Sequence, residues 1–142
     1  MADARIVSRK LEQIERYHSE LQKKQQELTR DDLFTNTTEQ RAVERMFENV
    51  IQACSDLAKH IAAQDFEDSN ETAANAIRVL CKENIIDSRT MQTLVSAIGF
   101  RNILAHEYGN VDYAEVYHNL QSGLDVFNDF SQQIAVWHQN TE

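Results

Sequence analysis

Four polar side chains stand close together in the segment RNILAHEYG, which covers residues 101–109 and is otherwise largely apolar. They are Arg101, Asn102, His106 and Tyr108. An arginine is always cationic and presents a planar set of N–H donors that matches phosphate oxygens. A histidine, with an ordinary pKa of about 6.5, can accept or donate a proton near neutrality. Together these residue types suit the cleavage of a phosphodiester bond.

A single copy of this segment lacks one chemical group for that reaction. Cleavage of RNA by its own 2′-hydroxyl without a metal needs a group that removes this proton, a second group that protonates the leaving oxygen, and a cation that stabilises the phosphorane. Gly99 falls on the same helical face as Asn102 and His106, and a residue without a side chain lets another backbone come close. We therefore expect Gly99 to be a dimer contact in a two-fold dimer, whose cleft holds two histidines and two arginines.

The spacing of these residues also allows a simpler interpretation. An arginine and a histidine near the C-terminal end of a helix interact favourably with the helix dipole. The asparagine and the tyrosine can be solvated there without any further role. From the residues alone, both interpretations stay open.

Hydrophobic periodicity predicts the helices that must position this segment. Apolar residues recur every three or four positions over five stretches of the chain. The predicted helices cover residues 3–28, 37–61, 71–83, 88–109 and 112–137. We expect Thr37 and Gln40 to form a capping box at the start of the second helix, Gly109 to cap the end of the fourth, and Asp112 with Glu115 to start the fifth. The first two helices should lie antiparallel.

Composition agrees with an all-α class. The chain has 142 residues, no proline and three glycines, and 42% of its residues are hydrophobic. This composition favours helix over strand, and the length is that of one domain. We therefore predict a single helical domain over residues 1–142, built as an up-and-down bundle of four to five helices.

Charge and cysteine content limit the classes of function. The formal net charge of −9 disfavours non-specific binding to nucleic acid, so any RNA must be bound locally. Cys54 and Cys81 lie within apolar helical patterns, as expected of buried, reduced thiols. Neither a signal peptide nor a membrane span is indicated, and we expect a soluble cytoplasmic protein. The histidines show no metal-ligand spacing, so we predict no metal and no cofactor.

The segment RNILAHEY resembles the Arg-x4-His-x-Tyr motif of HepT-type toxins, which are members of the HEPN superfamily of helical ribonucleases. The resemblance extends over most of the chain as a five-helix pattern in which the motif closes the fourth helix. It implies a homodimer with a composite, metal-independent ribonuclease site in the dimer cleft. It further implies a type VII-like toxin–antitoxin pair in which the antitoxin is a minimal nucleotidyltransferase of the MNT type.

The resemblance also implies a role for each residue of the motif. Arg101 and His106 would be the catalytic pair, and Asn102 would support them. Tyr108 would be the residue to which the antitoxin attaches AMP. This modification would neutralise the toxin.

Three basic residues precede the motif and are candidate RNA contacts, namely Arg78, Lys82 and Arg89. Taken singly, each is better explained as a solvated charge. Two functions from different classes therefore remain. The first is an endoribonuclease toxin that acts on RNA rather than DNA, favoured by the intact Arg101 and His106 pair. The second is a non-catalytic helical module that docks a nucleotidyltransferase, favoured by the acidic composition.

Overall fold

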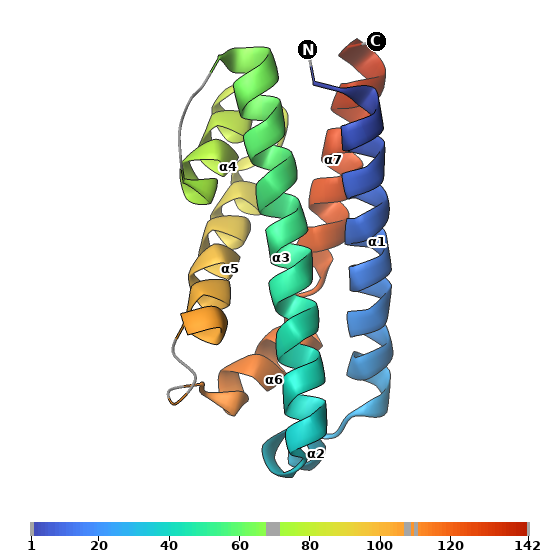
Figure 1. Ribbon diagram of the computed structural model, residues 1–142, viewed down its shortest axis with the longest axis vertical. Helices are drawn as coiled ribbons and strands as arrows, with labels where there is room; N and C mark the ends of the chain where they lie inside the picture. The colour runs from blue at the N-terminus through green and yellow to red at the C-terminus, as the bar shows by residue number, and fades with distance from the viewer. Residues whose placement is uncertain (1, 68–71, 107–108, 110, 142) are drawn as a thin grey trace.

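The computed structural model describes residues 2–67, 72–106, 109 and 111–141, and this part of the chain forms one bundle of seven α-helices without a strand (Figure 1). The predicted all-α class is confirmed. The helices are α1 (Ala4–Glu27), α2 (Arg30–Thr35), α3 (Thr37–Phe66), α4 (Ala73–Lys82), α5 (Ser88–His106), α6 (Tyr113–Ser122) and α7 (Asp125–Thr141).

The long helix α3 lies in the middle of the bundle and contacts most of the other helices. It runs antiparallel to α1, as predicted, and it also packs against α4 and α5 (Figure 1). Helix α7 packs against α1 and α5, so the core is enclosed by helices from both halves of the chain. Both termini lie at one end of the bundle, whereas α2, α6 and the last turn of α5 lie towards the other end (Figure 1).

Apolar side chains from all seven described helices fill the core. On α3, the predicted stripe from Val43 to Ile61 is buried apart from Met46, which is partly buried. Complete burial of one such side chain stabilises the fold by about 1.5–3 kcal/mol. The largest fully buried side chains are Phe47, Phe127, Phe130, Ile14, Leu21, Leu33, Ile51, Leu57, Ile61, Ile77, Leu80 and Leu94.

The connection between the first two long helices contains a short helix that the sequence interpretation missed. Helix α2 begins with a capping box in which Thr29 and Asp32 exchange side-chain-to-backbone hydrogen bonds. The N-cap of α3 is Asn36, whose side chain accepts a hydrogen bond from the Glu39 N–H at 3.2 Å. The predicted cap at Thr37 is therefore wrong by one residue, because Thr37 already belongs to the first turn.

The predicted last helix is two helices. Gly123 is the C-cap of α6, where its N–H donates to the Asn119 carbonyl at 2.8 Å, and α7 starts two residues later. The apolar pattern continues through the break because Leu120 and Leu124 are both buried, so periodicity could not reveal it. The start of α6 was predicted correctly, since Asp112 is its N-cap and accepts from the Ala114 N–H at 2.9 Å.

The end of the fourth predicted helix also differs from expectation. Helix α5 ends at His106, and no glycine among the described residues has a positive φ. Gly109 is therefore not a left-handed cap of the kind that favours glycine. The third helix agrees with its predicted range to within two residues at its start and one at its end.

Both cysteines are free thiols. Cys54 is buried in the core, and this burial raises the pKa of its thiol, so Cys54 stays protonated and acts as a small apolar side chain. Cys81 is partly buried on α4. In the described ranges, no helix combines the length and the apolar character needed to cross a bilayer.

Candidate active site

The N-terminal end of α5 is held by a cap that also joins it to α7. The Asp87 carboxylate accepts a hydrogen bond from the Thr90 N–H at 2.8 Å, and this bond is the main reason why the pKa of Asp87 lies below its usual value. Gln133 of α7 accepts from the Asp87 N–H at 2.8 Å and donates to the Asp87 carboxylate and to the Thr90 hydroxyl. These bonds fix the position of the helix that carries the motif.

The rotation of α5 about its axis is set by apolar side chains on its inner side. Leu94 and Leu104 are each 1% exposed. Between them, the Phe100 ring meets Phe47 of α3 edge-on, with ring centroids 5.3 Å apart and planes at 89°. Aromatic pairs favour this geometry. Since Phe100 directly precedes Arg101, the contact determines where the motif side chains leave the helix.

The motif residues differ in their exposure. Arg101 is half-buried, and its Nε atom is buried without a hydrogen-bond partner in the described part of the chain. Asn102 and His106 are exposed, and His106 is the last residue of α5. Tyr108, the predicted site of AMP attachment, lies outside the described residues.

Helix geometry does not bring the predicted catalytic pair together within one chain. Five positions along an α-helix correspond to a rotation of about 500°, so Arg101 and His106 leave α5 about 140° apart. This separation agrees with the half-buried arginine and the exposed histidine. A site that uses both types of side chain on one phosphate therefore needs a second element beside α5.

The exposed face of α5 is suited to receive such an element. Gly99 is exposed, and a Cβ atom built on it would meet nothing within 4 Å. Val95 and Ile103, one turn before and one turn after it, are only half-buried, as is Ile98. Gly99 thus lies between apolar side chains on a face that is open to a partner, as the predicted dimer contact requires.

The three candidate RNA contacts fall into two different environments. Arg78 and Lys82 are exposed, and a spacing of four residues places them on one face of α4. Arg89, near the start of α5, lines a cavity of about 200 Å³ together with Asp125 and Asp129. The two carboxylates outnumber the single guanidinium, which disfavours an RNA phosphate beside Arg89.

A buried carboxylate on α3, the helix that packs against α5, was missed by the sequence interpretation. Glu44 of α3 is 5% exposed, and it accepts hydrogen bonds from the Tyr113 hydroxyl at 3.0 Å and from Arg41 at 3.1 Å. Tyr113 is the first residue of α6. The available signal was an acidic residue between Val43 and Phe47, inside the apolar stripe of α3.

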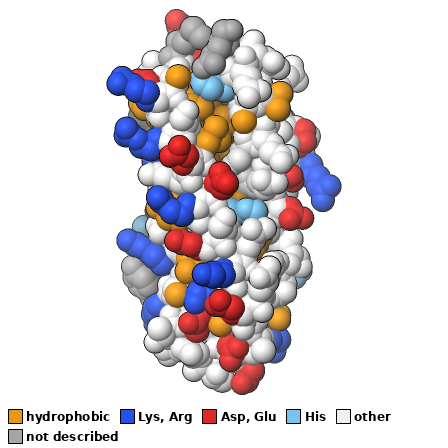
Figure 2. Space-filling model, turned by 90° about the vertical axis from the view of Figure 1, so that its right-hand side faces the viewer, with side chains coloured by type: hydrophobic (Ala, Val, Ile, Leu, Met, Phe, Trp, Pro, Cys, Tyr) orange, Lys and Arg blue, Asp and Glu red, His pale blue; other side chains and the backbone are white. Residues whose placement is uncertain are grey.

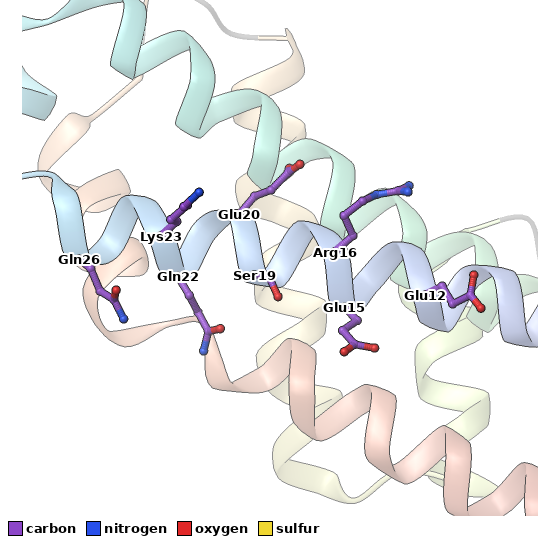
Figure 3. A pocket seen from close by; sticks show the side chains of 8 residues that line it. All are labelled: Glu12, Glu15, Arg16, Ser19, Glu20, Gln22, Lys23 and Gln26. Carbon is purple, nitrogen blue, oxygen red and sulfur yellow. The ribbon is translucent and has the colours of Figure 1, made fainter.

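The described surface along α1 lacks a comparable arrangement. A shallow region of about 720 Å³ lies along α1, but its side chains all come from this single helix and point away on both sides of it (Figure 3). On the side of the molecule where α1 lies, acidic and basic side chains are interspersed (Figure 2). Within the described ranges, no three His, Cys, Asp or Glu side chains are grouped in a way that could hold a metal ion.

Comparisons with known proteins agree on one family. The sequence matches the family described as Ribonuclease HepT-like over residues 10–134. A tRNA nuclease HepT from Aphanizomenon flos-aquae is 28% identical over 129 residues, which make up 91% of this chain and 87% of that protein. An mRNA nuclease HepT from Shewanella oneidensis is 29% identical over 79 residues, which make up 56% of this chain and 59% of that protein.

The fold agrees with a solved toxin structure. A tri-AMPylated HEPN toxin from Shewanella oneidensis, solved in complex with an MNT antitoxin, superposes with a TM-score of 0.85. The two sequences are 25% identical, and the match covers 96% of this chain and 99% of the toxin chain.

Proposed function

Because the chain belongs to the HepT-like ribonuclease family, we propose that it is a metal-independent endoribonuclease and the toxin of a toxin–antitoxin pair. One observation carries the proposal. The Nε atom of Arg101 is a buried donor without a partner in the described residues, on the helix whose last residue is the exposed His106. A buried donor without a partner is costly, so the Arg101 side chain gains free energy when it moves outwards and its donors pair with an anionic phosphate oxygen.

The reactive site forms between two copies of the chain. Since Arg101 and His106 leave α5 on different sides, one copy offers an incomplete site. A two-fold contact over the open face around Gly99, which His106 shares, brings two histidines to one cleft. The two long Arg101 side chains reach this cleft from the flanks of the paired helices. Asn102, exposed on the same face, orients the groups around the phosphate.

Each side chain then has a defined chemical role. One His106 imidazole removes the proton of the RNA 2′-hydroxyl, whose oxygen attacks the adjacent phosphorus. The His106 of the second copy protonates the leaving 5′-oxygen, and a cyclic phosphate remains. Arg101 stabilises the negative charge that develops on the phosphorane oxygens. Arg78 and Lys82 contact neighbouring phosphates.

The partner of this protein is a nucleotidyltransferase antitoxin of the MNT type. The Shewanella oneidensis toxin with the same fold is described as tri-AMPylated and bound to such an antitoxin. Here we assign the modification to Tyr108. Its phenol oxygen bonds to the α-phosphorus of ATP and pyrophosphate leaves. The attached AMP adds an anion and a nucleoside two positions after His106 in the sequence. The anion competes with RNA for the Arg101 guanidinium, and the nucleoside obstructs the entry of RNA.

The test is RNA cleavage by the purified protein in EDTA. His106→Ala and Arg101→Ala should each abolish cleavage and relieve growth arrest, while their circular dichroism stays that of the parent. His118→Ala and Arg9→Ala, which change an exposed histidine and an exposed arginine elsewhere, serve as controls. Undiminished cleavage by either motif variant, or a strict requirement for a divalent ion, contradicts the mechanism. A parent protein that binds the nucleotidyltransferase but never cleaves RNA supports the docking module instead.

A further inference from the structure

Glu44 is a buried acidic residue that the proposed reaction does not use. Its side chain has 7% exposure and lies on α3, which packs directly against α5. Burial of a carboxylate is costly unless charged or polar groups compensate for it. Its position therefore requires specific partners, and these partners indicate what the residue does.

Three side chains form a closed set of hydrogen bonds around this carboxylate. Glu44 Oε2 accepts from the Tyr113 hydroxyl at 3.0 Å and from Arg41 Nη1 at 3.1 Å. Arg41 Nη1 also donates to the Tyr113 hydroxyl at 3.3 Å. Burial and the bond to Glu44 raise the pKa of Tyr113, so its phenol remains a neutral donor. A bond to an ionised acceptor is stronger than one between neutral groups.

Two side chains of α3 thus hold the residues on either side of the motif, namely Phe100 before it and Tyr113 after it. Phe47 packs against Phe100, the residue before Arg101, and Glu44 holds Tyr113, the first residue of α6. Because Glu44 and Phe47 are three positions apart, they lie on the same face of α3. Both Arg101 and His106 lie between the two anchored points. A chain segment anchored at both ends has far fewer conformations than one anchored at a single end.

We propose that Glu44 is a positioning residue of the ribonuclease site. By holding Tyr113, it fixes the start of α6 relative to α3, and so it limits how far the end of α5, which carries the exposed His106, can move away from its alignment with the phosphate. Glu44 does not touch the substrate. The proposal rests on the proposed function, because it assigns Glu44 a role in that same reaction.

The test compares variants that remove the acceptor, the donor or only the charge. Glu44→Leu and Tyr113→Phe should each lower kcat for RNA cleavage about tenfold or more and leave KM almost unchanged, since a misplaced catalytic group slows the chemical step. Glu44→Gln retains an oxygen that can accept both bonds, so it should recover most of kcat. The double variant Glu44→Leu/Tyr113→Phe should be no slower than the slower single variant.

Ser55→Ala is the matched control. Ser55 is a buried polar residue of the same helix, and its hydroxyl bonds only to the Ile51 carbonyl in the described structure. This variant should keep kcat. Amide hydrogen exchange should become faster in the first turn of α6 in Glu44→Leu, and it should stay unchanged in α7.

The possible results separate the two proposals. An active parent whose Glu44→Leu and Tyr113→Phe variants keep the parent kcat overturns the role of Glu44 and leaves the ribonuclease intact. A loss of kcat in Ser55→Ala equal to that in Glu44→Leu also overturns it, because the effect is then general destabilisation. A parent that cleaves no RNA overturns the ribonuclease itself. If Glu44→Leu does not fold, Glu44→Gln and Tyr113→Phe decide the question.

Discussion

The Nε2 atom of His18 on α1 and the Oγ atom of Ser131 on α7 are both buried, and neither has a hydrogen-bond partner in the described part of the chain. The two side chains line the same cavity of about 320 Å³ between α1 and α7. Burial lowers the pKa of His18, although the Asp125 charge and the Leu124 backbone act in the opposite direction. His18 is therefore neutral in the folded protein at a pH where an unfolded chain binds a proton.

This difference predicts an acid-sensitive fold. The contribution of His18 to stability is complete above the unfolded pKa of about 6.5. It is lost as the pH falls from there through the lower folded pKa, because protonation then favours the unfolded chain. In urea unfolding at pH 7.5 and pH 5.5, His18→Gln should lose less stability between the two values than the parent. His118→Gln, at an exposed site, controls for removal of an imidazole. Equal losses in His18→Gln and the parent would assign the acid sensitivity to other groups.

The dimer contact is predicted to respond to side-chain size at Gly99. Because a Cβ atom here meets nothing within 4 Å, Gly99→Ala should leave a single chain unstrained and stabilise α5 by about 0.5–1 kcal/mol. Gly99→Leu should weaken the dimer by about 1–3 kcal/mol through overpacking between subunits. The fraction of dimer measured by light scattering and the rate of RNA cleavage should fall together. The control Ser19→Leu, on the exposed side of α1, should change neither the dimer fraction nor the cleavage rate. A Gly99→Leu dimer as tight as the parent dimer would place the contact elsewhere.

Modification is predicted to depend on Tyr108. Tyr108→Phe keeps the ring but lacks the oxygen that accepts AMP, so it should cleave RNA yet escape the antitoxin. Co-expression with the nucleotidyltransferase and intact-mass spectrometry should show AMP adducts on the parent and on Tyr117→Phe, but none on Tyr108→Phe. Adducts on Tyr113 are not expected, because Glu44 and Arg41 engage its hydroxyl. A Tyr108→Phe protein still silenced by AMP would assign the modification to another residue.

Measurements of RNA affinity are predicted to distinguish Arg78 and Lys82, which contribute to binding, from Arg89, which does not. Arg78→Ala and Lys82→Ala should each weaken binding of a catalytically inactive protein and reduce the slope of log K against log salt by about one. Arg89→Ala should have little effect, since Asp125 and Asp129 line the same cavity. Fluorescence anisotropy at several salt concentrations measures both quantities. A loss of affinity confined to Arg89→Ala would reverse this assignment.

Local patterns in the sequence were sufficient for most of the fold. The period of apolar residues predicted the buried stripe of α3, and the Asp112 cap predicted the start of α6, because a helix face and a cap depend on residues a few positions apart. The same periodicity did not reveal the break between α6 and α7 at Gly123, because buried leucines lie on both sides of this glycine. Residue types and the family resemblance singled out Arg101 and His106, and their assignment as the catalytic pair stays a prediction.

Tertiary packing was needed to show how this segment is held. Glu44 and Tyr113 are 69 positions apart, and Asp87 and Gln133 are 46 positions apart, so no periodicity connects either pair. Whether an acidic residue is solvated or buried depends on which helices pack around it, and this packing is the sum of many long-range contacts. Packing likewise left Arg101 half-buried although its neighbour Asn102 is exposed.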